Sequence, residues 1–214
     1  MSLGVAAGSA RQLTLAARSG TCRVFRWALL LGGCMLLTGC PTLFPEPSEP
    51  ARRYDFGPLP EPVALDVSAT VDRINAPSWL REQLIPYRQI YRAPEALNHY
   101  RGHRWVATPT ELLGQRLRQL LADDADGAAP WRLELELVSF EQVFTRADEA
   151  HAEIRLRAVL RNGTARTGEA PMRHRIHQRQ SVSADVQGAI SGLPAVADLA
   201  LQDLLRWIEE ATAK

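Results

Sequence analysis

Cysteine is scarce in this chain and absent from most of it. The three cysteines of the 214-residue sequence are Cys22, Cys34 and Cys40, and no cysteine follows. The part of the chain after Cys40 therefore has no thiol for a disulfide or for a thiolate metal site. A disulfide-stapled scaffold and a zinc finger are both excluded for this part.

Acidic residues are absent before Cys40, where the chain carries four arginines. The whole chain has 25 basic and 24 acidic residues, so the part after Cys40 has an excess of three negative charges. A slight negative excess gives no electrostatic footprint for nucleic acid. We expect no nucleic-acid partner.

The common catalytic and nucleotide-binding motifs are also missing. No GxSxG, HExxH, P-loop or GxGxxG pattern occurs in the sequence,. His174 and His177 would share one face of a helix, but a separation of three places them on opposite faces of a strand. We therefore predict no metal site, no cofactor and no enzymatic activity.

The apolar run from Trp27 to Leu37 has about the length of a secretory h-region and is shorter than the ~20 residues that span a bilayer,. Arg23 and Arg26 precede it, and Leu37, Thr38 and Gly39 then lead into Cys40, in a pattern that resembles the bacterial lipobox. We predict a signal peptide over residues 1–39 and lipidation of Cys40. An alternative lipobox ending at Cys34 would leave an apolar run too short for an h-region.

The residues after Cys40 predict where the protein is anchored and how far it reaches. Pro41 and Thr42 follow the cysteine, where an aspartate would favour retention in the inner membrane, so we expect an outer-membrane lipoprotein facing the periplasm. Residues 41–62 hold seven of the fourteen prolines, a composition typical of an extended tether,. At ~3.1 Å per residue such a tether reaches roughly 70 Å. We predict a lipidated tether over residues 40–62 and one domain over residues 63–214.

Alternating apolar residues predict the strands of this domain. The pattern has a period of two over Val63–Val71, Arg132–Phe144, His151–Leu160 and Met172–Gln180,. The last three of these segments predict an antiparallel meander with one solvent-exposed face, whose charged residues form cross-strand pairs. A short strand is expected at Ile90 and Tyr91, and the segment from Tyr100 to Trp105 is expected to lead into a helix.

Two helices are predicted from apolar stripes and capping residues. One begins at Thr108 as N-cap and Pro109, and should end near Asp123,. The other runs from Ser183 or Asp185 to the C-terminus, with a break near Leu193 because glycines and Pro194 weaken its first turns,. The expected fold class is α+β, a mainly antiparallel sheet with both amphipathic helices on one face.

Aromatic and arginine residues are concentrated between Trp79 and Trp105, and these types are enriched in protein interfaces,. Whether this region is an interface or fills the core under a long loop stays open from sequence. The candidates for partner binding are Tyr87, Arg88, Tyr91, Arg92 and Trp105.

From residue 53 to the C-terminus the order of features resembles the ABC-type transport auxiliary lipoprotein family, the PqiC/YmbA-like group. The resemblance rests on YDFGPLP after the tether, INAPSWL, IYR, HRWVATPTELLGQRLRQLL, the long strand ending in Phe140 and Phe144, and the C-terminal helix. The RWVATP stretch departs from the commoner form, which has a second tryptophan or an acidic residue before the proline.

This resemblance implies a non-catalytic outer-membrane subunit of an intermembrane lipid transport system. Its partners would be a periplasmic MCE-domain protein and the inner-membrane components of the transporter, and the resemblance also allows a homo-oligomer. The alternatives are an assembly or scaffold lipoprotein of another envelope system and, less favoured by the sequence, a tethered periplasmic enzyme.

Overall fold

The structure, a computed structural model, describes residues 50–59, 69–121, 130–163 and 170–213. The predicted lipobox, Cys40 and most of the predicted tether lie outside these residues. The described residues belong to one compact unit that begins at Glu49. Its first strand, β1 (Arg52–Tyr54), pairs with β4 although it falls within the range predicted to be tether.

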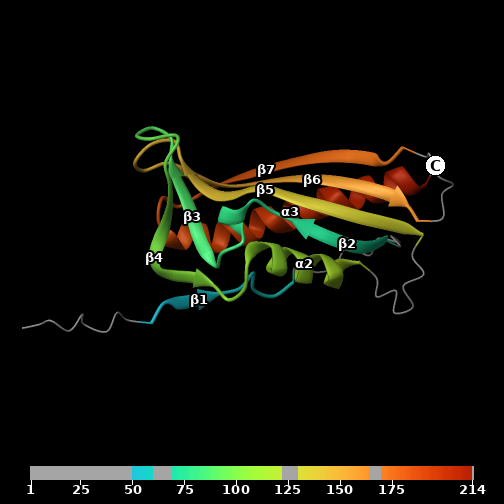
Figure 1. The fold of residues 1–214 in the computed structure, drawn as a ribbon. Coiled ribbons are helices and arrows are strands. Elements are labelled where there is room, and N and C mark those ends of the chain that lie inside the picture. Colours follow the sequence, from blue (N-terminus) through green and yellow to red (C-terminus); the bar gives the residue numbers. More distant parts are fainter. Residues whose placement is uncertain (1–49, 60–68, 122–129, 164–169, 214) are drawn as a thin grey trace, which may run out of the picture. The chain divides into compact units, whose positions relative to one another are not determined.

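A seven-stranded mixed sheet organises this unit (Figure 1). Its path runs β1-β4-β3-β5-β6-β7, and β2 also pairs with β5. The remaining strands are β2 (Ala69–Asn75), β3 (Leu84–Gln89), β4 (Leu97–Trp105), β5 (Trp131–Phe144), β6 (Ala150–Asn162) and β7 (Met172–Val182). The predicted meander is confirmed, because β5, β6 and β7 pair antiparallel over almost their full lengths.

The central strand β5 has two different neighbours along one of its edges. Its first half, Trp131–Glu136, pairs in parallel with β2, and its last three residues, Gln142–Phe144, pair in parallel with β3. A 3-10 helix, η2 (Ser78–Leu80), follows β2. The sequence did not predict these parallel ladders, which are short beside the antiparallel ones.

The alternation of inward and outward side chains along β5 is inverted at a bulge. Leu133, Leu135 and Leu137 face the core, and the register with β6 then shifts between Leu137 and Ser139. An extra residue in one strand turns the following side chains to the other face. Phe140 therefore faces the core, and Glu141 faces outward.

Both helices contribute to the core on the inner face of the sheet, the face that carries Leu135, Leu156 and Ile176. Helix α2 (Pro109–Leu120) begins at the predicted N-cap Thr108, which also forms a capping box with Glu111,. Helix α3 (Val186–Thr212) packs on β5, β6 and β7 (Figure 1). The α+β class with a mainly antiparallel sheet is thus confirmed.

Three local predictions need correction. The strand expected at Ile90 and Tyr91 ends at Gln89 instead, because the chain turns there and the N–H groups of Arg92 and Ala93 donate to the carbonyl of Gln89. The segment before α2, from Tyr100, is part of strand β4.

The third correction concerns the C-terminal helix, which is continuous through Pro194 and begins at the N-cap Asp185. A Cβ atom at Gly192 would overlap Cγ1 of Val182, so this glycine allows α3 to lie close to the sheet. Close packing therefore outweighs the low helix propensity of glycine here. Neither helix among the described residues is both long and apolar enough to cross a membrane.

Candidate functional site

The connection between β3 and β4 is one part of the predicted interface region that lies at the surface. We call residues 90–96 the β3–β4 tip. Ile90 and Tyr91 are 41% and 46% exposed, and Arg92 is exposed beside them. Large apolar side chains next to an arginine at the surface are typical of protein contacts. The tip thus presents two large apolar side chains, one cation, Arg92, and one anion, Glu95, to solvent.

Backbone hydrogen bonds hold this tip in one conformation. The N–H group of Ile90 donates to the carbonyl of Phe144 at 3.1 Å, which joins the tip to the end of β5. The N–H groups of Arg92 and Ala93 donate to the carbonyl of Gln89 at 3.0 and 2.9 Å. A surface that is already ordered loses little conformational entropy on binding.

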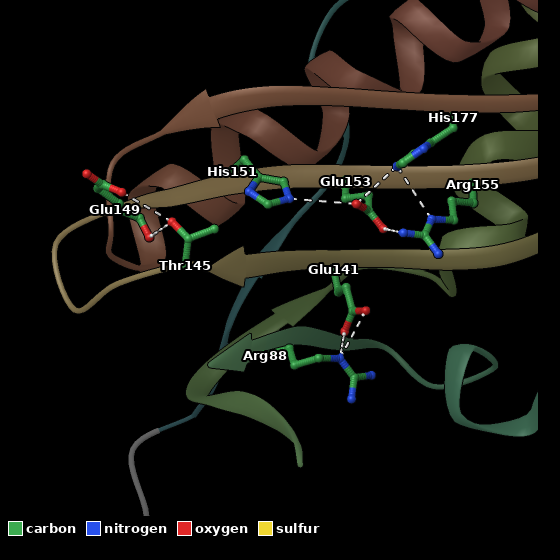
Figure 2. A network of polar contacts seen from close by, with 8 residues as sticks. All are labelled: Arg88, Glu141, Thr145, Glu149, His151, Glu153, Arg155 and His177. Carbon is green, nitrogen blue, oxygen red and sulfur yellow. Dashed lines mark hydrogen bonds and ion pairs between the residues drawn. The ribbon is translucent and has the colours of Figure 1, made fainter. Parts of the chain in front are cut away.

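The Arg88 side chain connects the tip to strand β5. Its Nε lies 3.2 and 3.1 Å from the two carboxylate oxygens of Glu141 (Figure 2). Its Nη1 donates to the carbonyl of Pro94 at 2.9 Å. Glu141 is 6% exposed. Burial raises the pKa of Glu141, and the hydrogen bond and charge of Arg88 oppose that rise. Arg88 is therefore a brace between strand β5 and the tip.

Replacing Arg88 by alanine should destabilise the fold at pH 7 by about 1–2 kcal/mol, because it leaves the Glu141 carboxylate buried without its cation. Since the folded-state pKa of Glu141 is raised, protonation favours the folded state, and the loss should shrink as the pH falls toward 4,. Urea unfolding at both pH values measures this. Arg92→Ala, which removes an exposed arginine of the tip, is the control, and an equal loss at both pH values would contradict the assignment.

A second ion cluster lies on the same outer face of the sheet, around Glu153 on β6. Glu153 is 5% exposed, and its carboxylate oxygens lie 2.9 Å from Nη2 of Arg155, 3.1 Å from Nε2 of His177 and 3.7 Å from Nε2 of His151 (Figure 2). Desolvation by burial lowers the pKa of His151. Glu141 lies directly opposite Glu153 in the ladder. Each of the two carboxylates is paired with its own arginine, Glu141 with Arg88 and Glu153 with Arg155.

Chemically, these clusters pair buried carboxylates with cations. Among the residues that the structure describes, no group of three His, Cys, Asp or Glu side chains is arranged to hold a metal ion. His174 and His177 do point to opposite faces of β7: His177 contacts Glu153 on the outer face, whereas His174 stacks on Trp207 of α3.

Tyr87 lies on the inner face, away from the tip. Its ring centroid is 4.7 Å from that of Tyr100 and 5.8 Å from that of Phe144. The Tyr100 hydroxyl donates to Oε1 of Gln142 at 2.5 Å, and burial raises the pKa of Tyr100. The side-chain amide of Gln142 donates to the carbonyl of Ser183 at 2.7 Å. These residues join the sheet to the start of α3.

Trp105 is fully buried at the end of β4, with its ring 5.6 Å from Phe56 and 6.1 Å from Phe140. Of the five candidate residues, Tyr91 and Arg92 thus lie at the tip, and Arg88 supports it from the end of β3. Tyr87 packs inside, and Trp105 belongs to the core. The region between Trp79 and Trp105 is partly surface and partly core.

Sequence reasoning missed the buried ion pairs, although a signal for two of them was present. Ser139 and Phe140 invert the alternation that precedes them, which indicates the bulge and the new orientation of Glu141,. Arg116 forms a buried ion pair with Asp198 of α3, at 3.1 Å. It lies at helical spacing from Leu112 and Leu113, on the apolar stripe of α2, where a charge requires a partner,. No comparable pattern indicated that Glu153 is buried, because it is one of several charged residues that alternate with apolar ones along β6.

Comparison with known proteins gives a likeness in fold. No protein-family model matches the chain, and no curated protein matches it. One similar structure is the crystal structure of protein XCC0632 from Xanthomonas campestris, which is described by the family model DUF330. Its sequence is 16% identical to this chain, and the TM-score is 0.58, with 81% of this chain and 95% of that chain covered.

Two further structures are similar at comparable identity. An uncharacterized protein is 15% identical over 75% of this chain and 99% of that one, again with a TM-score of 0.58. A putative lipoprotein from Caulobacter crescentus is 15% identical over 49% of this chain and 83% of that one, with a TM-score of 0.38. The chain therefore has a fold similar to that of the DUF330 protein from Xanthomonas campestris.

Proposed function

We propose that this protein is a non-catalytic lipoprotein of the outer membrane that docks the periplasmic MCE-domain component of an intermembrane lipid transport system. Cys40 carries the acyl chains, and the proline-rich segment after it holds the folded domain away from the membrane. The lipobox-like sequence and the resemblance to transport auxiliary lipoproteins support this proposal, and the fold likeness is compatible with it.

The observation that carries the proposal is the β3–β4 tip. It is an exposed surface of two large apolar side chains and an arginine on a braced backbone, and it contains the IYR segment on which the resemblance partly rests. Tyrosine and arginine supply large contacts in interfaces. We propose that Tyr91 and Arg92 contact the MCE-domain protein directly, with Arg88 holding them in place.

Co-purification tests this assignment. The tagged full chain, extracted from envelopes with mild detergent, should retain an MCE-domain protein, and the double variant Tyr91→Ala/Arg92→Ala should reduce the retained amount about tenfold. The matched control is Leu199→Ala/Arg206→Ala, which removes one exposed apolar residue and one exposed arginine from α3 and should change nothing.

Two results would count against the proposal. If the tip variant retained as much MCE-domain protein as the wild type, the contact would lie on another surface. Recovery of only outer-membrane assembly factors, with no MCE-domain protein, would favour a scaffold lipoprotein of another envelope system.

A further inference from the structure

A broad open groove of about 1040 Å³ crosses the outer face of the sheet, apart from the β3–β4 tip. One side of it is formed by Trp79 of η2 with Pro77, and the other by Arg173 and Arg175 on the edge strand β7. Central strands β5 and β6 lie between these sides. We call this feature the arginine groove.

The arginines of the groove are unequally paired. Arg157 on β6 lies 3.1 Å from Glu136, and Glu134 is shared by Arg73 and Arg161 at 3.6 Å each. Among the described residues, Arg173 and Arg175 have no ion pair or side-chain hydrogen bond. These two cations therefore give the β7 side of the groove an unbalanced positive charge.

One of these cations faces a like charge. Arg175 lies directly opposite Arg157 in the β6–β7 ladder. Like charges at directly opposed positions destabilise a sheet. Since Glu136 pairs with Arg157 and leaves Arg175 unpaired, a carboxylate bound over the outer face of β6 and β7, beside Arg175, would relieve the remaining repulsion.

The rest of the groove is suited to apolar side chains. Trp79 is 38% exposed, and Val138 and Val159 line the groove from β5 and β6. An exposed tryptophan beside apolar residues and arginines provides the contact types that dominate protein interfaces. The groove thus combines an apolar surface with two free cations.

We infer that the arginine groove binds an extended, acidic segment of a partner protein, with carboxylates on Arg173 and Arg175 and an apolar side chain against Trp79. Guanidinium groups bind carboxylates in a planar, two-bonded geometry. A flat anionic bilayer is a poorer occupant, because a flat surface does not enter a groove whose cations lie on one side, on β7, opposite Trp79 and Pro77. This inference stands independently of the proposed docking of the MCE-domain protein.

A synthetic probe peptide tests the inference on the full chain in non-ionic detergent. A fluorescein-labelled peptide of alternating glutamate and valine should bind with a rise in fluorescence anisotropy, and added salt should weaken it. A peptide of alternating lysine and valine should not bind. Glycerol phosphate serves as a probe for lipid headgroups and should not displace the acidic peptide.

The variant Arg175→Glu separates binding from folding. It should weaken peptide binding about tenfold, because it removes one cation and repels the carboxylates. It should also raise Tm by about 1–3 °C, because Arg157 then faces an opposite charge. Arg101→Glu makes the same charge change at an exposed position of β4, and it should leave peptide binding within about twofold of the wild type,. Trp79→Ala should weaken binding without unfolding the protein.

Either of two results would overturn the inference. One is equal weakening by Arg175→Glu and Arg101→Glu, which would indicate a response to net charge alone. The other is binding of glycerol phosphate without binding of the acidic peptide, which would identify a headgroup site.

Discussion

Replacing Trp105 by alanine is expected to lower the free energy of unfolding by about 3–5 kcal/mol, the range for truncation of large buried aromatic side chains. Trp105 has no exposed surface and packs against Phe56 and Phe140. For a domain of this size the change corresponds to a fall in Tm of roughly 6–20 °C. Chemical denaturation measures the loss directly.

Two further variants sharpen this result. Trp105→Phe should cost clearly less than the alanine variant, because it retains most of the buried apolar volume. Trp79→Ala should change stability by less than about 1 kcal/mol, since Trp79 is 38% exposed,. If Trp105→Ala left stability unchanged and abolished only partner retention, Trp105 would be a contact residue and the core described above would be incorrect.

Replacing Arg116 by methionine is expected to destabilise the protein by about 3 kcal/mol at pH 7. The Arg116 side chain is buried, its Nε lies 3.1 Å from Oδ1 of Asp198 on α3, and its Nη2 donates to the carbonyl of Phe56 at 2.5 Å. Methionine keeps the apolar volume but leaves a half-buried carboxylate without a cation and a carbonyl without its donor. Arg116 therefore ties α2 to α3 and to the segment after β1.

The pH dependence of this loss gives an independent check. Burial raises the pKa of Asp198, and Arg116 opposes that rise, so the variant should raise this pKa further. An acid whose pKa is raised in the folded state favours folding when protonated, so the loss should diminish as the pH falls through that raised value.

The double variant Arg116→Met/Asp198→Leu provides the second control. It should recover much of the stability lost in Arg116→Met, because no unpaired charge remains. Arg118→Met, at an exposed position of the same helix, should have little effect. Additive losses in the double variant would show that the pair is not coupled.

The elements predicted correctly are those with a local cause in the sequence. Helix α2 follows from the capping residues Thr108 and Glu111, and strands β6 and β7 follow from uninterrupted alternation. The parallel pairing of β5 with β2 and β3 depends on contacts between residues far apart in the chain, which no local pattern records.

For the candidate site too, the sequence predicted some positions correctly and left others open. Tyr91 and Arg92 lie at the surface as the interface hypothesis requires, but the sequence left the position of Trp105 open, because tryptophan is common both in cores and in interfaces,. Arg88 was a candidate contact residue. Its pairing with Glu141 makes it a support for the tip, and the bulge in β5 is what brings the two together.

Photocrosslinking from the β3–β4 tip tests the proposed docking most directly. A photoreactive phenylalanine derivative at position 91 of the full chain, activated by light in intact cells, should crosslink to a periplasmic MCE-domain protein. The same group at position 199, equally exposed but on α3, should give no such product. Crosslinking to the MCE-domain protein from position 91 alone is the expected result. Its absence at position 91, with the wild-type anchor intact and the chain folded, would contradict the proposed function.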